Sequence, residues 1–286
     1  MGSGPWRSWV LIGGLLAVTA TTVGGAPLPT WDTSLFGGPG VCAICHQSDG
    51  NVLVGPGGED LSPTTDWRST MMANAFRDPL FRAKLESEVA RHPALQTVIE
   101  DTCLTCHAPM GRTQAIQDGA AGITLVEAVS SEVAQGGVSC TLCHQIQPDG
   151  LGDLPSHSGG FVIRGGRVIF GPYEDLQAQM MRAVANFDAA FGAQVMQSEL
   201  CATCHTLFVP YVDDGGAIAG EFPEQTPYLE WLNSVYASGV EETQCQDCHM
   251  PPLYDGVVIS SLPPSLPSRS PFWRHHFVGG NALMGR

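Results

Sequence analysis

The pentapeptide Cys-x-x-Cys-His occurs five times in this chain and constrains its fold more than any other feature. We number the copies motif 1 to motif 5, and they begin at Cys42, Cys103, Cys140, Cys201 and Cys245. Two thiols three positions apart can each add to one vinyl group of a single haem, and the histidine that follows can ligate the iron. The sequence therefore predicts five covalently bound haem c groups.

The five motifs together use all ten cysteines of the chain. A single Cys-x-x-Cys is also typical of a redox dithiol or of half a zinc site. Five copies, each followed by histidine, favour haem over zinc ribbons or disulfides. The predicted attachment residues are Cys42, Cys45, Cys103, Cys106, Cys140, Cys143, Cys201, Cys204, Cys245 and Cys248, and the predicted proximal ligands are His46, His107, His144, His205 and His249.

The composition agrees with a chain wrapped around cofactors. Its 286 residues include 34 Gly and 21 Pro, and long periodic segments are few. Five haems add apolar volume, so such a chain needs less aliphatic core than its length suggests. We expect a mainly α fold with extensive irregular loops, a multihaem cytochrome c architecture that forms one domain over residues 27–286, with room for one β-hairpin.

The first 26 residues have the pattern of an export signal. Arg7 supplies a short basic region, Trp9–Ala20 is apolar, and small residues follow as far as Ala26. The alternative is an anchor that is kept, because the apolar run approaches the length of a membrane span. Either interpretation places the haem domain in the periplasm or outside the cell.

The formal net charge is −15, and Lys84 is the only lysine. Such a surface disfavours binding to nucleic acid or anionic lipid and attracts a basic redox protein. An acidic surface that only keeps an exported protein soluble would have the same composition.

Helix signals are local and lie mostly near motifs. Asp78-Pro79 predicts a helix that ends near His92, before Pro93, and a second short helix then leads to Cys103. A capping box is predicted at Thr124 and Glu127, with Gly136 closing the helix.

The second half contains further strand and helix patterns. Phe161–Phe170 predicts a β-hairpin with a Gly-Gly turn, and Glu174–Phe191 predicts a long helix. Another helix is expected from Thr226 to Gly239, and Ser261–Phe272 is expected to be an extended segment.

Four histidines lie outside the motifs, namely His92, His157, His275 and His276. A haem with protein ligands on both faces passes electrons, whereas an open haem can bind a substrate. We expect His92, His157 and one of the pair His275/His276 to be distal ligands. Methionine is the other common axial ligand, and Met72 is the candidate for a further iron.

Several stretches resemble multihaem cytochromes of the broad group that contains hydroxylamine oxidoreductase and its tetrahaem electron acceptor. Those relatives carry Trp-x-x-Ser-x-His-Ala ahead of haem motifs, and the histidine is a distal ligand. Histidine is missing at both matching places here, which hold Trp67, Thr70 and Met72, and Trp231, Ser234 and Tyr236. The resemblance makes Met72 a substitute ligand, while Tyr236 is expected to pack or to form hydrogen bonds. The similarity between the two stretches is explained by chance or by duplication, and the recurring spacing of 61 residues from motif 1 to 2 and from motif 3 to 4 fits duplication.

The expected function is electron transfer outside the cytoplasm between a donor and an acceptor redox protein. Enzymes of the resembling group carry a dedicated open haem, sometimes with a lysine ligand, whereas all five motifs here end in histidine. This favours an electron carrier over a catalyst. The alternatives are an oxidoreductase that acts on a small nitrogen or sulfur compound at one open haem, and a haem-wire subunit of a filament or membrane respiratory complex, in which a neighbouring chain could donate an axial ligand.

Two weaker patterns have ordinary alternatives. Asp213-Asp214-Gly215-Gly216 offers the oxygen ligands of a calcium site, but a solvated turn needs the same residues. Arg164, Arg167 and Arg274 could pair with haem propionates or only add solubility.

Overall fold

The computed structural model describes Met1, residues 27–239 and residues 242–279. The expected signal peptide therefore lies outside the described residues, apart from Met1. Within the ranges given, no helix has both the length and the apolar composition that a membrane span requires.

Short helices joined by irregular segments make up most of the structure, as expected. The helices of the first half are α1 (Pro39–Ala43), α2 (Pro63–Arg68), α3 (Met71–Asn74), α4 (Pro79–Arg91), α5 (Gln96–His107), α6 (Pro109–Gln117), α7 (Leu125–Ser130) and α8 (Glu132–Gln135). Those of the second half are α9 (Cys140–Cys143), α10 (Ala178–Ala185), α11 (Ser198–His205), α12 (Pro227–Leu232) and α13 (Cys245–His249). Three short 3-10 helices are η1 (Pro93–Leu95), η2 (Leu154–Ser156) and η3 (Ala193–Met196).

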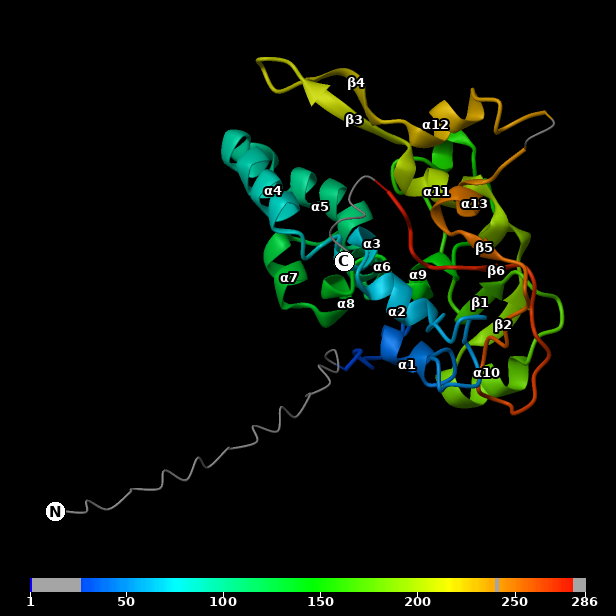
Figure 1. Cartoon of the computed structure of the whole chain (residues 1–286). Coiled ribbons are helices and arrows are strands. Elements are labelled where there is room, and N and C mark those ends of the chain that lie inside the picture. The colour runs from blue at the N-terminus through cyan, green and yellow to red at the C-terminus, as the bar shows by residue number, and fades with distance from the viewer. Residues whose placement is uncertain (2–26, 240–241, 280–286) are drawn as a thin grey trace.

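The strands form three separate two-stranded sheets. They are β1 (Val168–Gly171), β2 (Asp188–Phe191), β3 (Leu207–Val212), β4 (Ile218–Gln225), β5 (Pro252–Leu253) and β6 (Phe272–Trp273). The pair β1–β2 is parallel, whereas β3–β4 and β5–β6 are antiparallel. In Figure 1 helices α4 to α8 gather on one side of the molecule, the sheets β1–β2 and β5–β6 lie on the other, and the β3–β4 hairpin projects at the top.

The helix starts predicted at Asp78 and Thr124 are confirmed, whereas the single helix predicted from Thr124 to Gly136 is divided into α7 and α8. The Asp78 carboxylate accepts a hydrogen bond from the Leu80 N–H at 2.9 Å, and α4 ends at Arg91. Thr124 and Glu127 form both bonds of a capping box at the start of α7. Gly136 caps the separate short helix α8. These signals are local, so the sequence alone determines them.

The predicted hairpin at Phe161–Phe170 is wrong. Strand β1 pairs with β2, about twenty residues further along, while Ile163 forms an isolated bridge with Ile146. Arg167 explains the change, because it has a φ of 56° and its guanidinium donates to the Asp32 carboxylate at 2.7 Å. This contact turns the chain away from the Gly-Gly turn. The hairpin of this fold is β3–β4 instead.

The helix predicted over Glu174–Phe191 is also wrong in extent. Only α10 is helical, and Asn186, in the left-handed region with a φ of 55°, ends it. Phe187 is then buried with the Arg167 guanidinium 4.0 Å above its ring, and residues 188–191 become β2. Burial of one aromatic ring therefore overrides the helical pattern.

Helix α12 is shorter than the predicted segment to Gly239. The Asn233 side chain donates to the Leu229 carbonyl at 2.7 Å, and the Ser234 hydroxyl donates to the Trp231 carbonyl at 2.6 Å. The Ser234 N–H also donates to the Trp231 carbonyl at 2.9 Å, three residues back instead of four, so the helical pattern stops and α12 ends at Leu232.

The described residues form three hydrophobic clusters that share no residue. One lies among α4 to α8 around Phe76 and Leu104, and another surrounds Phe36 and Leu142. The third joins Leu53 and Leu61 to the C-terminal segment. The hydrophobic core of the described residues is therefore divided among three places rather than gathered at one centre.

Candidate functional site

Every motif begins in a helix. Helices α5, α11 and α13 end at the motif histidine, whereas α1 and α9 end one or more residues before it. Residues three positions apart on a helix lie on the same face, so both thiols of a motif can reach one group. The helical setting therefore suits the covalent attachment that the spacing predicts.

Backbone carbonyls hold four of the five motif histidines by the same ring nitrogen. The Nδ1 atoms of His46, His107 and His144 lie 2.8, 3.1 and 2.7 Å from the carbonyl oxygens of Ile259, Ala75 and Phe170. The His249 Nδ1 is likewise bonded to the Val278 carbonyl. A carbonyl only accepts, so each Nδ1 carries the proton and each Nε2 keeps its lone pair. Metal-ligating histidines are held in this way, so these residues fit haem iron.

Burial favours the neutral form of four motif histidines. Burial lowers the pKa of His46, His107, His144 and His205 below the ordinary value, and the bonds to backbone carbonyls only partly oppose this effect in the first three. A neutral imidazole is the form that binds a metal, so no proton has to be displaced at neutral pH.

Thiols of different motifs lie close enough to change one another's pKa. Cys42 of motif 1 is hydrogen-bonded to Cys140 of motif 3, and this bond together with burial raises the pKa of the Cys42 thiol. The same kind of contact joins motifs 2 and 4 through Cys106 and Cys204. A third contact joins motifs 4 and 5 through Cys201 and Cys245. The motifs thus form one connected cluster although they are far apart in sequence.

Motif 3 lies close to motif 4 as well. Burial raises the pKa of Cys143 to about 12, and negative charge on Cys204 adds to that increase. Motif 4 therefore has three neighbouring motifs.

The β3–β4 hairpin reaches motif 2. Negative charge on Glu224 of β4 raises the pKa of Cys103, after the larger effect of burial, and it also acts on His107. The Gln225 side chain donates to the Cys204 carbonyl at 3.0 Å. On the other side of motif 2, the Phe81 ring of α4 stacks on His107 with ring centroids 3.7 Å apart. Motif 2 thus lies between α4 and the hairpin.

The adjacent residues His275 and His276 have different neighbours. The His275 ring lies 6.3 Å from that of His144, centroid to centroid. The His276 Nδ1 lies 3.6 Å from the Asp66 carboxylate, and its side chain is 42% exposed. Only His275 therefore faces a motif histidine.

His157 is the most unusual of the candidate ligands. Both of its ring nitrogens are buried and neither has a hydrogen-bond partner, while its ring edge lies against Tyr228. Nearly all buried polar atoms in folded proteins are paired. A bond from one nitrogen to a metal would satisfy it, so His157 also fits haem iron.

The remaining candidates have less distinctive surroundings. His92 is exposed at the end of α4, and Met72 is half-buried in α3. The Met72 carbonyl accepts a hydrogen bond from Val138, two residues before motif 3. Their roles as ligands stay predictions.

The three arginines considered for haem propionates are paired with Asp carboxylates of the chain. Arg164 bonds to Asp149, and Arg167 bonds to Asp32. Arg274 forms two bonds to Asp66, at 2.7 and 2.6 Å. The Arg274–Asp66 pair is buried and joins segments 208 residues apart, which no local pattern in the sequence could reveal.

The Asp213–Gly216 segment is the turn of the β3–β4 hairpin. The Asp213 carboxylate accepts from the Gly215 and Ala217 N–H groups at 2.8 and 3.0 Å, which is the ordinary use of aspartate in a turn. In the part of the chain that the structure describes, no group of three or more His, Cys, Asp or Glu residues could hold a metal ion. The geometry favours the turn over a calcium site.

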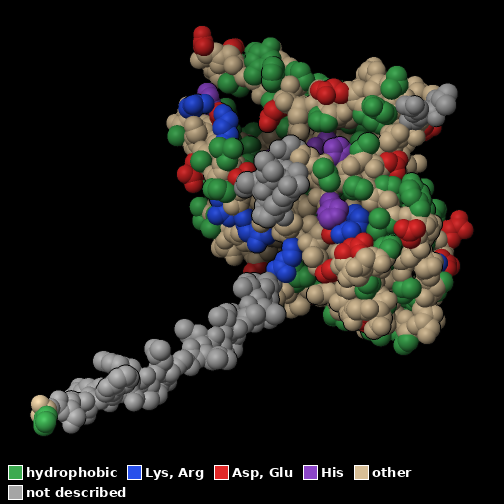
Figure 2. Space-filling view, viewed as in Figure 1, with side chains coloured by type: hydrophobic (Ala, Val, Ile, Leu, Met, Phe, Trp, Pro, Cys, Tyr) green, Lys and Arg blue, Asp and Glu red, His purple; other side chains and the backbone are tan. Residues whose placement is uncertain are grey.

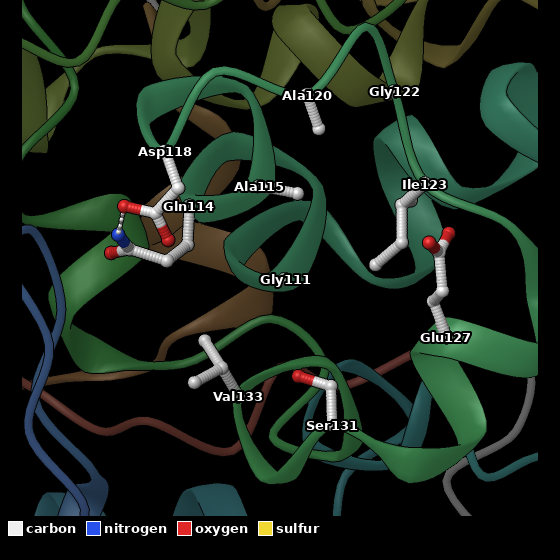
Figure 3. Close-up of a pocket in the computed structure, with 10 residues that line it drawn as sticks. All are labelled: Gly111, Gln114, Ala115, Asp118, Ala120, Gly122, Ile123, Glu127, Ser131 and Val133. Atoms are coloured by element: carbon white, nitrogen blue, oxygen red, sulfur yellow. Dashed lines mark hydrogen bonds between the residues drawn. The ribbon is translucent and has the colours of Figure 1, made fainter.

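A cavity of about 240 Å³ lies between α6, α7 and α8 and contains no motif residue (Figure 3). Its polar groups already have partners: Gln114 donates to Asp118 at 2.9 Å, and Glu127 belongs to the capping box. The cavity therefore offers no free group for catalysis or metal binding.

Comparison with known proteins links the chain to haem proteins. The family model described as cytochrome c554 and c-prime matches residues 41–145, which include motifs 1 to 3 and amount to less than half of the chain. No curated protein and no solved structure gives a significant match. The match supports a c-type cytochrome, in which haem is bound covalently and serves electron transfer.

Proposed function

We propose that this protein binds five haem c groups, one at each motif, and transfers electrons between two redox proteins outside the cytoplasm. Haem c supplies reversible one-electron chemistry when it is bound. The observation that carries the proposal is the contact between thiols of different motifs, Cys42 with Cys140, Cys106 with Cys204, and Cys201 with Cys245. Because each of these thiols would be bonded to a haem, touching thiols imply neighbouring haems.

These contacts also give the proposed order of the motifs. Motif 1 touches motif 3, motif 3 lies near motif 4, and motif 4 touches both motif 2 and motif 5. Motif 4 would then be a junction with three neighbours, and motifs 1, 2 and 5 would be the ends where partner proteins deliver or accept electrons.

The chain would supply the second ligands of some irons. Burial of both unpartnered ring nitrogens supports His157 as one of them. His92 and Met72 stay as further candidates, because exposure of His92 and partial burial of Met72 neither require nor prevent iron binding. An iron with protein ligands on both faces has no position for a substrate, so each ligand that is found favours an electron carrier over a catalyst.

The charge distribution supports a basic partner. Between Arg182 and Arg269 the chain has eleven Asp and Glu residues and no Lys or Arg, and this stretch contains motifs 4 and 5. Figure 2 shows acidic side chains scattered over the visible face, with most of the visible basic ones on the side of α4. A basic redox protein would be attracted to this acidic stretch, most strongly at low ionic strength. The expected signal over residues 1–26 supports export.

The test begins with the intact mass of the mature protein. Five haem increments and no free thiol are expected, and fewer increments on a fully matured sample would refute the proposal. Two variants then test the order of the motifs. Removing motif 5 by Cys245→Ala/Cys248→Ala should leave four connected haems, whereas Cys201→Ala/Cys204→Ala removes the junction.

After mixing with a limiting amount of reductant, the wild-type protein and the motif 5 variant should redistribute electrons in one fast phase. The motif 4 variant should show an added slow phase whose rate rises with protein concentration, because electrons must then move between molecules. Equal kinetics in the two variants would contradict the proposal that motif 4 connects the other haems.

A further inference from the structure

We propose that His275 is the second axial ligand of the iron whose first ligand is His144, so that motif 3 holds a six-coordinate haem. The inference rests on the proposed function, since it requires a haem at motif 3. It assigns one member of the pair His275/His276 to one particular motif.

The separation of the two rings is the first argument. Their centroids are 6.3 Å apart and their planes are inclined by 21°. A metal–imidazole bond is about 2 Å long and the ring centroid lies about 1 Å beyond the bonded nitrogen, so two imidazoles on opposite sides of one metal ion have centroids about 6 Å apart. The observed distance matches this value.

The second argument concerns which nitrogen each ring has left. The His144 Nδ1 donates to the Phe170 carbonyl at 2.7 Å, and the His275 Nδ1 donates to the Trp273 carbonyl at 3.1 Å. Among the described residues, neither Nε2 has a hydrogen-bond partner. Both rings therefore keep an Nε2 lone pair for a metal, and carbonyls fix the tautomer of both.

The contacts of the two side chains explain why His275, rather than His276, is assigned as the ligand. The chain makes a turn at His275 and His276, directly after β6 and Arg274. Arg274 and His276 both lie against Asp66, at 2.6 and 3.6 Å from its Oδ1 atom. The ring of His275 instead lies beside the ring of His144.

The backbone on both sides of His275 is anchored. Arg274 holds Asp66 of α2 through two bonds, in a pair whose side chains are 15% and 4% exposed. Three residues later, the Val278 N–H donates to the His249 carbonyl at 2.9 Å, and the His249 Nδ1 bonds to the Val278 carbonyl. These contacts hold the chain on both sides of His275 against α2 and motif 5, and the His275 ring lies beside His144 of motif 3.

The experiment compares His275→Ala with His276→Ala, each purified with its covalent haems. Electron paramagnetic resonance of the oxidised His275→Ala protein should show one additional high-spin haem. The matched control, His276→Ala, should keep the spectrum of the wild-type protein. Added imidazole should return the high-spin signal of His275→Ala to low spin, because it fills the vacant coordination position without restoring any packing contact.

The assignment to motif 3 is tested in a background that lacks this haem, made by Cys140→Ala/Cys143→Ala. There His275→Ala should add no high-spin signal. If His275→Ala keeps a wild-type spectrum, His144 and His275 only pack against each other. If His276→Ala alone changes the spectrum, His276 rather than His275 is the ligand. Either result overturns the inference while the five haem increments in the intact mass, and thus the proposed function, still stand.

Discussion

The indole N–H of Trp67 donates a hydrogen bond to the Val138 carbonyl, 2.8 Å away and two residues before motif 3. Trp231 makes the same contact with the Thr243 carbonyl, also at 2.8 Å and two residues before motif 5. Each tryptophan therefore fixes the segment that leads into a motif.

Equivalent backbone hydrogen bonds also occur near both tryptophans. The Val138 N–H donates to the Met72 carbonyl at 3.0 Å, and the Thr243 N–H donates to the Tyr236 carbonyl at 2.9 Å. Met72 and Tyr236 each lie five residues after their tryptophan. The similarity of the two stretches thus reflects one local arrangement used twice. Simple duplication of a two-haem unit does not account for it, because one stretch lies between motifs 1 and 2 and the other between motifs 4 and 5.

Replacing either tryptophan by phenylalanine tests this arrangement. Trp67→Phe and Trp231→Phe each keep an aromatic ring but lose the hydrogen bond, so each should lower the free energy of unfolding by about 1 kcal/mol. The loss should be larger for Trp67, which is 6% exposed. Urea unfolding followed by circular dichroism measures both values, and unchanged midpoints would show that the indole bonds add nothing.

The Asp66–Arg274 pair should be important for stability. Removing one member of a buried ion pair leaves an uncompensated charge, so Asp66→Asn should cost about 3–5 kcal/mol of unfolding free energy. The matched control is Arg164→Gln, because the Arg164 and Asp149 side chains are 62% and 50% exposed. That exposed pair should contribute about 0–1 kcal/mol. Equal losses in the two variants would contradict the distinction.

Stability should decrease in acid partly through Asp60. Burial alone would raise its pKa, but hydrogen bonds from Ser62 and Thr65 and the charge of Arg274 outweigh burial and lower the pKa below 3.8. The carboxylate therefore stabilises the fold above the unfolded pKa, and this contribution is lost as the pH falls through the lower folded value. Asp60→Asn should flatten the dependence of the unfolding midpoint on pH below about 4. A slope equal to that of the wild-type protein would show that other carboxylates dominate.

Met72 and His157 can be tested by the same spectroscopy. His157→Ala should create one high-spin haem, because no other described group bonds to either ring nitrogen. Met72→Ala should do the same and abolish a thioether-to-iron charge-transfer band, whereas Met71→Ala should not, since neighbouring helical residues point about 100° apart. If Met72→Ala leaves the spin state and the band unchanged, Met72 is a packing residue and its iron has another ligand or none.

The parts of this structure that the sequence predicts are those encoded by neighbouring residues. Cys-x-x-Cys-His is recognisable because attachment chemistry requires contiguous groups, and the caps at Asp78 and Thr124 involve residues two or three apart. Contacts between distant residues override weaker patterns. The chain between Glu174 and Phe191 has a helical pattern, but Phe187 is buried beneath Arg167, and β2 finds its partner in β1.

The residues of the candidate site likewise include some that the sequence predicts and others that only the structure reveals. The five proximal histidines follow from spacing, whereas the choice between His275 and His276 depends on Asp66, more than 200 residues earlier. Counting histidines predicts that one of the pair is a ligand. Only the folded arrangement after β6, with Arg274 and His276 against Asp66 and His275 beside His144, shows which one faces motif 3.

The three separate hydrophobic clusters have a consequence for how this protein is made. The buried apolar side chains of these clusters are distributed among small groups, so residues 27–239 and 242–279 alone do not supply the continuous core on which cooperative folding depends. Covalent attachment of the cofactors would then have to precede folding, and the newly made chain would remain open to the attachment machinery until its last motif is filled. On the proposed export, such a chain would cross the membrane unfolded, and haem attachment and folding would follow translocation.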